Sequence, residues 1–250
     1  MMKKPAFYRL GAVFLALCIW QAAAMAVGLD MLLASPLQVI ERLISVWKEK
    51  DFVSTVLFSA LRIGFGFLLA FMLGTLLAVL AGRFRIVENL LWPYVVTFRS
   101  VPVASFIILA LIWLSSKQLT VFISFLIAFP VLYSNVLQGI RTADPQLLEM
   151  TSLFRVPWRR RFLYVMLPSI RPYLLSASSV AVGMCWKAGV AAEIIGVVKG
   201  SIGEKLYEAK IYLQSADLFA WTVMIILFSV LMEKAFLFLL KRAFAGVEKL

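Results

Sequence analysis

The sequence predicts an all-α integral membrane protein with six transmembrane helices. Of its 250 residues, 63% are hydrophobic and 15% are charged, and the mean hydropathy is +0.95; soluble domains carry about 25% charged residues. Apolar runs of about 20 residues, the length that crosses a bilayer core, recur along the chain. The charges stand between these runs, as in the loops of membrane proteins. We expect one membrane domain over residues 1–250.

The first apolar run, from Leu10 to Leu29, follows the basic residues Lys3, Lys4 and Arg9. It is long enough to cross the bilayer. A cleavable signal peptide is the alternative, because small residues lie near the end of the run. The length of the run and the apolar character of the rest of the chain favour a transmembrane helix.

The second run follows Arg62 and carries no charge. Its small residues recur at every fourth position, as Gly66, Ala70, Gly74, Ala78 and Gly82. On a helix they form one stripe, which lets another helix backbone approach closely. We favour packing inside the subunit over a contact between two copies of the chain.

The remaining elements follow from the positions of apolar runs and prolines. They are a third element over 90–114 that Pro93 and Pro102 kink or break, a fourth over 119–138 with Pro130 inside, a fifth over 172–192 with Lys187 inside, and a sixth from Leu218 to Glu233 and Lys234.

Charge counting orients these helices. The chain has 25 Lys and Arg against 13 Asp and Glu. With a cytoplasmic N-terminus, the inside segments are the N-terminal arm, Arg83 with Arg85, the loop 141–168 and the C-terminal tail, and they are rich in Lys and Arg. The outside segments are 30–55, the turn from Ser115 to Lys117, and 197–215, and the two long ones are nearly neutral. The positive-inside rule therefore places both termini in the cytoplasm. Nucleic-acid binding is rejected, because the cations do not cluster on one soluble face.

Several kinds of chemistry are excluded by residue type. There is no histidine, and the two cysteines, Cys18 and Cys185, lie in apolar runs. Catalytic triads with histidine and histidine-rich zinc sites are therefore excluded, and we expect no metal site. The chain contains no phosphate-binding loop of the form GxxxxGK[ST], so we expect it neither to bind nor to hydrolyse ATP.

The loop from Arg141 to Pro168 is long and patterned. Asp144 and Pro145 form an N-cap with proline at the first helical position. The helix that follows places Leu147, Met150 and Phe154 on one face. A break is expected at Arg155 to Pro157, and a second, basic helix then carries Trp158 and three arginines before Leu167 and Pro168 open the fifth membrane helix. Such a helix pair is typical of a docking surface for a partner, or of an interfacial helix on anionic lipid, and spacing alone does not choose between them.

The same loop resembles the cytoplasmic motif of ABC importer permeases. That motif reads Glu-Ala-Ala, three residues, Gly, nine residues, Ile, one residue, Leu-Pro. Here Glu149, Val165, Leu167 and Pro168 stand at the matching positions. The stretches EMTSLFRVPWRRRFLYVMLPSIRPYLL, SALRIGFGF and WKAGVAAEIIG resemble the nitrate, sulfonate and taurine branch of these permeases.

The resemblance implies a type I importer permease fold, in which the loop 141–168 couples to a separate nucleotide-binding ATPase that binds ATP and Mg²⁺. The residues expected against that ATPase are Leu147, Glu149, Met150, Phe154, Arg155, Pro157, Trp158, Leu167 and Pro168. It also implies an extracytoplasmic solute-binding protein, a bacterial plasma membrane and, as the simplest assembly, a homodimer. Two departures stand out, because Met150 and Thr151 replace the alanines and Arg155 replaces the glycine. We expect Pro157 to make the turn instead.

Arg99, Lys187 and Glu193 are the candidate residues of the translocation pathway, since charges within a membrane are costly and often functional. The alternative for Lys187 and Glu193 is snorkelling to the outer interface. Arg99 and Lys187 would supply positive potential for an anionic or polar solute of the sulfonate, nitrate or taurine kind, whereas bicarbonate or a pyrimidine precursor of thiamine is the alternative. An ion-driven transporter is disfavoured by the lack of an inverted repeat, and a membrane enzyme by the lack of a catalytic cluster.

Overall fold

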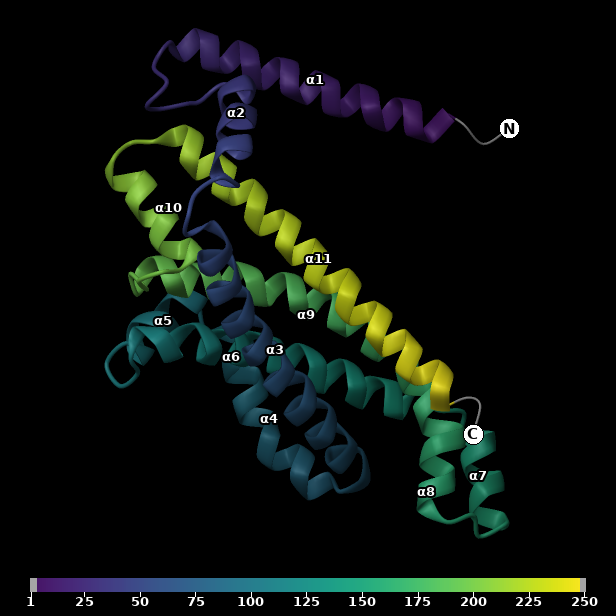
Figure 1. Ribbon diagram of the computed structural model, residues 1–250. Helices are drawn as coiled ribbons and strands as arrows, with labels where there is room; N and C mark the ends of the chain where they lie inside the picture. Colours follow the sequence, from purple (N-terminus) through teal and green to yellow (C-terminus); the bar gives the residue numbers. More distant parts are fainter. Residues whose placement is uncertain (1–3, 248–250) are drawn as a thin grey trace.

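The computed structural model describes residues 4–247, so Lys3 lies outside the described residues. Every regular element within that range is helical (Figure 1). The helices are α1 (Lys4–Val27), α2 (Pro36–Val46), α3 (Phe52–Arg83), α4 (Arg85–Ser100), α5 (Val103–Ala110), α6 (Ser116–Arg141), α7 (Pro145–Leu153), α8 (Trp158–Arg161), a π-helical turn (Phe162–Met166), α9 (Leu167–Ile195), α10 (Ile202–Ile211) and α11 (Ser215–Val247).

Within the described range, four helical stretches are long and apolar enough to cross a membrane: α3, α6, α8 through α9, and α11. The pair α4 and α5 qualifies as a fifth, broken span with a bend of 104°. The apolar part of α1, Gly11–Val27, is shorter. Six transmembrane helices therefore remain a prediction.

The break that was predicted in the third element is confirmed. Pro102 caps α5, and Val101 before it is extended, at φ −81° and ψ 133°. A residue that precedes proline is kept out of the helical region by the proline ring, so α4 ends there.

The small-residue stripe of α3 lies against α6. Gly66, Ala70, Gly74 and Ala78 are buried. A Cβ atom on Gly66 would lie 2.5 Å from the carbonyl oxygen of Val121, a backbone atom that cannot swing aside. The stripe therefore brings two helix backbones together within one chain, which is the first of the two alternatives given above.

The helix α9 packs against both α6 and α3 at glycines. A Cβ on Gly139 of α6 would lie 3.0 Å from the Cα of Ile170 on α9. A Cβ on Gly189 of α9 would lie 2.7 Å from the side chain of Ile63 on α3 and 2.9 Å from the Ser124 hydroxyl on α6. The core is consequently a tight layer of α3, α6 and α9, in which each helix touches the other two. Small residues at helix crossings provide this van der Waals contact, which is the main attraction between helices in lipid.

The N-terminal helices attach to α11. Figure 1 shows α1 lying apart from the α3, α6 and α9 layer, with α2 leading back to it. The Trp20 indole N–H donates to the Ala34 carbonyl at 3.1 Å, and its ring lies 5.0 Å from the Phe219 ring. On α2, Arg42 forms ion pairs with Glu49 and with Asp217 at the start of α11.

Candidate functional site

The helices α7 and α8 project past the ends of α6 and α9, at the lower right of Figure 1. The predicted start of α7 is confirmed, since the Asp144 carboxylate accepts a hydrogen bond from the Gln146 backbone N–H at 2.8 Å and Pro145 is the first helical residue. Such a cap satisfies a backbone donor that the helix itself leaves unpaired.

The turn after α7 is made by Arg155 itself. Arg155 has φ 51°, the left-handed region that favours glycine. The Val156 N–H donates to the Thr151 carbonyl at 2.9 Å, and the Arg155 N–H donates to the Ser152 carbonyl at 3.1 Å. These two bonds define a Schellman helix end with Arg155 in the glycine position.

The prediction that Pro157 makes this turn is therefore wrong. Pro157 is extended, at φ −61° and ψ 144°, and serves as the residue before α8. A Schellman end satisfies two carbonyl groups of the helix, and the hydrogen bonds that it gains outweigh the steric cost of an L-residue in the left-handed region.

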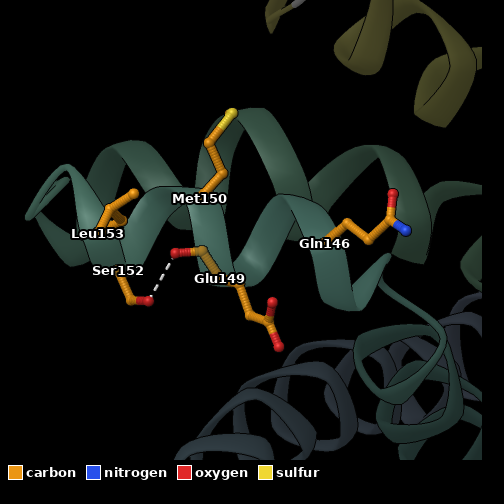
Figure 2. Close-up of a pocket in the computed structure, with 5 residues that line it drawn as sticks. All are labelled: Gln146, Glu149, Met150, Ser152 and Leu153. Atoms are coloured by element: carbon orange, nitrogen blue, oxygen red, sulfur yellow. Dashed lines mark hydrogen bonds between the residues drawn. The ribbon is translucent and has the colours of Figure 1, made fainter.

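One face of α7 is open to the surroundings (Figure 2). Gln146, Glu149, Met150, Ser152 and Leu153 line a shallow hollow of about 560 Å³. Leu153 is 80% exposed and the neighbouring Phe154 is 73% exposed. Large apolar side chains this exposed on an ordered helix are characteristic of an interaction surface.

Polar and buried groups of α7 are placed around that hollow. The Ser152 hydroxyl donates to the Glu149 carbonyl at 2.6 Å, while the Glu149 carboxylate has no partner within the described part of the chain. Thr151, which stands at an alanine position of the motif, is the buried residue of α7. Its hydroxyl donates to the Leu148 carbonyl at 2.8 Å, within the same helix. Because Thr151 is buried and Glu149 is exposed, the Thr151 side of α7 faces the protein and the Glu149 carboxylate is available to a partner.

The second helix of the segment is fixed to the membrane helices. The Trp158 ring stacks on Phe162 at 5.3 Å, and the Arg83 guanidinium at the end of α3 lies 5.3 Å from the Trp158 ring. The predicted basic helix is confirmed as α8, and it continues through the π-helical turn into α9. Leu167 packs against the core at the start of α9, whereas Pro168 is exposed.

Arg99 lies at the end of α4 and lines a cavity of about 240 Å³. Its Nη2 donates to the carbonyl of Pro130 at 3.2 Å. The same cavity is lined by Glu88 and Arg141, which form an ion pair at 2.5 Å. Lys187 is exposed on α9 and does not line this cavity, so the structure does not bring the two predicted cations of the pathway together there.

Glu193 is fully buried where α3, α9 and α10 meet. Its Oε2 accepts hydrogen bonds from the Ser59 hydroxyl at 2.9 Å and from the Gly203 N–H at 3.2 Å, and the Ser59 oxygen accepts from the Ile202 N–H at 3.0 Å. Snorkelling is therefore wrong for Glu193. Sequence reasoning missed Ser59, because a serine in an apolar run gives no sign of a partner 134 positions away.

In the part of the chain that the structure describes, no group of three or more Cys, Asp or Glu side chains is placed to hold a metal ion.

Comparison with known proteins gives a family-level match. The model of the family described as "Binding-protein-dependent transport system inner membrane component" matches residues 70–245, which include the α7–α8 segment and the whole of α9 and α10.

Relatives with named roles are similar over most of their length. The chain is 30% identical to a putative aliphatic sulfonates transport permease of Bacillus subtilis, with 96% of this chain and 89% of the relative covered. It is 26% identical to a nitrate import permease of Synechococcus elongatus (77% and 72% covered) and 26% identical to a formylaminopyrimidine transport permease of Halalkalibacterium halodurans (73% of each covered).

A solved structure shares the fold. The chain superposes on a structure described as "Crystal structure of an amino acid ABC transporter with histidines" with a TM-score of 0.59, at 15% identity, covering 78% of this chain and 94% of that one. At this identity the likeness concerns the fold alone.

Proposed function

Because this chain belongs to the binding-protein-dependent inner membrane components of ABC importers, we propose that its α7–α8 segment docks on a separate nucleotide-binding ATPase. The chain is a multi-pass membrane permease by family. In the proposed complex the ATPase binds ATP and Mg²⁺, and closure of two ATPases moves the membrane helices through this segment.

The observation that carries the proposal is the conformation of Arg155. Its left-handed backbone is the conformation that glycine would take at that position of the motif, so the helix pair keeps the motif's turn despite the substitution. The open face of α7, with exposed Leu153, Phe154 and Glu149, then lies in register with the motif. Glu149 is the charged residue that lines the hollow on α7, while the arginines lie in the turn and on α8. An apolar face with an acidic charge suits a protein groove better than an anionic lipid surface, which would favour basic residues on that face.

The test is association with the ATPase in membranes. Leu153→Glu and Glu149→Lys are expected to reduce recovery of the ATPase with the permease at least tenfold, because each places a charge against the proposed contact. Leu163→Glu, a charge on an exposed position of the π-helical turn outside the docking face, is the matched control. Equal recovery of the ATPase with all three variants would contradict the docking proposal.

Both termini are proposed to lie in the cytoplasm with the α7–α8 segment. The end of α11 lies at the same end of the molecule as α7 and α8 (Figure 1), and the Arg171 guanidinium at the start of α9 lies 5.8 Å from the ring of Phe244 near the end of α11. This supports a shared side for the segment and the C-terminal tail. Cysteine labelling from outside intact cells tests it: reagent that does not cross the membrane should miss Ser152→Cys and reach Lys199→Cys.

We infer a homodimer of this chain, with an extracytoplasmic solute-binding protein delivering the substrate. The family description names dependence on a binding protein. The chain carries the permease motif once, so two identical copies are the simplest way to supply one docking segment to each of two ATPases. Co-expression of two differently tagged copies tests the dimer, since capture through one tag should recover the other.

The proposed substrate is a small anionic or polar solute of the sulfonate or nitrate kind. Similarity to a sulfonate permease and a nitrate permease supports an anion, and similarity to a formylaminopyrimidine permease keeps a thiamine-precursor-like pyrimidine as the second candidate. Arg99 at its cavity and Lys187 on α9 are proposed to supply positive potential to the pathway. Uptake of labelled taurine, nitrate and pyrimidine by the wild type would identify the substrate. Uptake by Arg99→Gln and Lys187→Gln tests the two cations, and undiminished uptake by both variants at equal expression would show that neither belongs to the pathway.

A further inference from the structure

A groove between α3 and α6 combines an apolar floor with cations at one end. It has a volume of about 610 Å³ and is lined along its length by Phe65, Leu73 and Phe122, among other apolar side chains. At one end it is lined by Arg62, Lys117 and Gln118. The groove lies away from α7, α8 and the Arg99 cavity.

The groove has the depth of one membrane leaflet. Arg62 and Leu73 are eleven residues apart on α3, which corresponds to about 16 Å of helix at 1.5 Å per residue. The hydrocarbon core of a bilayer is about 30 Å thick, so half of it is about 15 Å. Arg62 also directly precedes the uncharged run of α3, which places the cationic end at a membrane boundary.

Within the described part of the chain, the cations at that end have unused hydrogen-bond donors. Arg62 Nη1 is buried without a hydrogen-bond partner, while the guanidinium lies 3.3 Å from the centroid of the Phe58 ring. Glu193 interacts electrostatically with Arg62, but no hydrogen bond joins the two side chains. Its Oε2 is bonded to Ser59 and Gly203, and its Oε1 is buried without a hydrogen-bond partner in the described part of the chain. Lys117 is exposed and has no partner within the described part of the chain.

We propose that this groove binds an anionic phospholipid of the surrounding bilayer, with its phosphate between Arg62 and Lys117 and an acyl chain along Phe65 and Leu73. The arrangement supplies charge at the depth of the headgroup and an apolar wall at the depth of the acyl chains. Gln118 adds an amide donor beside the phosphate.

A helix from a second copy of the chain fits the groove less well. The apolar helix α1, which lies apart from the layer formed by α3, α6 and α9, contains no Asp or Glu. A copy of α1 in the groove would bring no anion to Arg62 and Lys117 and would surround them with apolar side chains, which is unfavourable for both charges. Charge complementarity therefore favours lipid. This proposal requires only that the chain is a membrane protein, and it does not depend on the docking of an ATPase.

Binding is measured by native mass spectrometry of the purified full-length chain in detergent, titrated with phosphatidylglycerol or with phosphatidylcholine. The wild-type chain should bind phosphatidylglycerol at least about tenfold more tightly than phosphatidylcholine. Lys117→Gln should lower that affinity about fivefold, the effect of one cation near an anionic headgroup, and leave phosphatidylcholine binding unchanged. Lys117 is exposed, so this variant is expected to fold.

Two controls distinguish lipid binding in the groove from the general effects of lost positive charge and added bulk. Lys199→Gln with Lys210→Gln removes two exposed cations beyond the groove, near α10, and should leave the lipid preference intact. Leu69→Trp, which fills the groove, should weaken binding of both lipids, whereas Leu76→Trp, two turns further along α3 and outside the lining, should not.

A photoreactive benzoylphenylalanine at position 69, activated in native membranes, identifies the occupant. A lipid adduct supports the proposal, and a covalent dimer of the chain overturns it. Equal phosphatidylglycerol affinity for wild type and Lys117→Gln also overturns it.

Discussion

Replacing Arg155 by glycine is expected to stabilise the end of α7. An L-residue in the left-handed region costs roughly 1–2 kcal/mol, and glycine removes this steric cost. Glycine also loses more conformational freedom when the turn closes, which offsets the gain by about 0.5–1 kcal/mol. The net gain is about 0.5–1 kcal/mol. Since Arg155 is exposed and makes no ion pair within the described residues, loss of its side chain takes little away.

Hydrogen exchange of the Val156 amide measures this directly. That amide donates to the Thr151 carbonyl at 2.9 Å only while the turn is closed. A gain of about 0.5–1 kcal/mol corresponds to about two- to fivefold slower exchange, because 1.4 kcal/mol is a factor of ten. Peptides over α7 and α8 should show the change, and peptides from α10 should not.

Arg155→Ala is the matched control. Alanine removes the charge but keeps the Cβ atom, so it should leave the exchange rate close to that of wild type. Slower exchange in the alanine variant, equal to that of glycine, would show that the charge and not the backbone conformation sets the stability. Exchange in Arg155→Gly as fast as wild type would refute the reasoning outright.

Three further changes test other parts of the fold. Gly66→Ala should destabilise the chain by about 1–3 kcal/mol, because its Cβ would meet the Val121 backbone at 2.5 Å. Gly64→Ala, whose Cβ would have its nearest atom at 3.8 Å, should be neutral or stabilising, and thermal unfolding in detergent compares the two variants. Val197→Gly, at φ 44° after α9, should raise the midpoint of that unfolding, since a β-branched residue is strained there. Glu193→Ala should cost about 1–3 kcal/mol and speed amide exchange in α10, because it leaves the Ser59 hydroxyl and the Gly203 N–H without an acceptor, while Glu193→Gln keeps an oxygen in place and should be milder.

The features that sequence reasoning predicted are those that depend on neighbouring residues. Asp144 and Pro145 start α7, Pro102 separates α4 from α5, and the four-residue spacing of small residues in α3 forms one stripe, all because helix ends and faces are local properties. The partner of that stripe required the structure.

The features that it missed depend on distant residues or on a competition between local terms. The burial of Glu193 depends on Ser59 and on the arrival of α10, so no window of the sequence contains it. The turn at Arg155 depends on whether two helix-end hydrogen bonds outweigh steric strain, and residue preference alone indicates the opposite outcome. The same conformation recurs after α10 at Leu213, where the Gln214 N–H donates to the Ala209 carbonyl at 2.8 Å.

The connections of the α7–α8 segment determine what a partner on α7 would move. A displacement of α7 reaches α8 across a turn closed by two hydrogen bonds, and α8 runs through the π-helical turn into α9 without a loop. Trp158 of α8 also contacts Arg83 at the end of α3, so a displacement of α7 would reach both α9 and α3. Both helices contact α6 at glycines, where close-packed backbones shift together rather than deform separately. In the proposed complex, motion of the ATPases would therefore move the α3, α6 and α9 layer as one body, and the 104° break between α4 and α5 offers a place where these two helices can move relative to that layer.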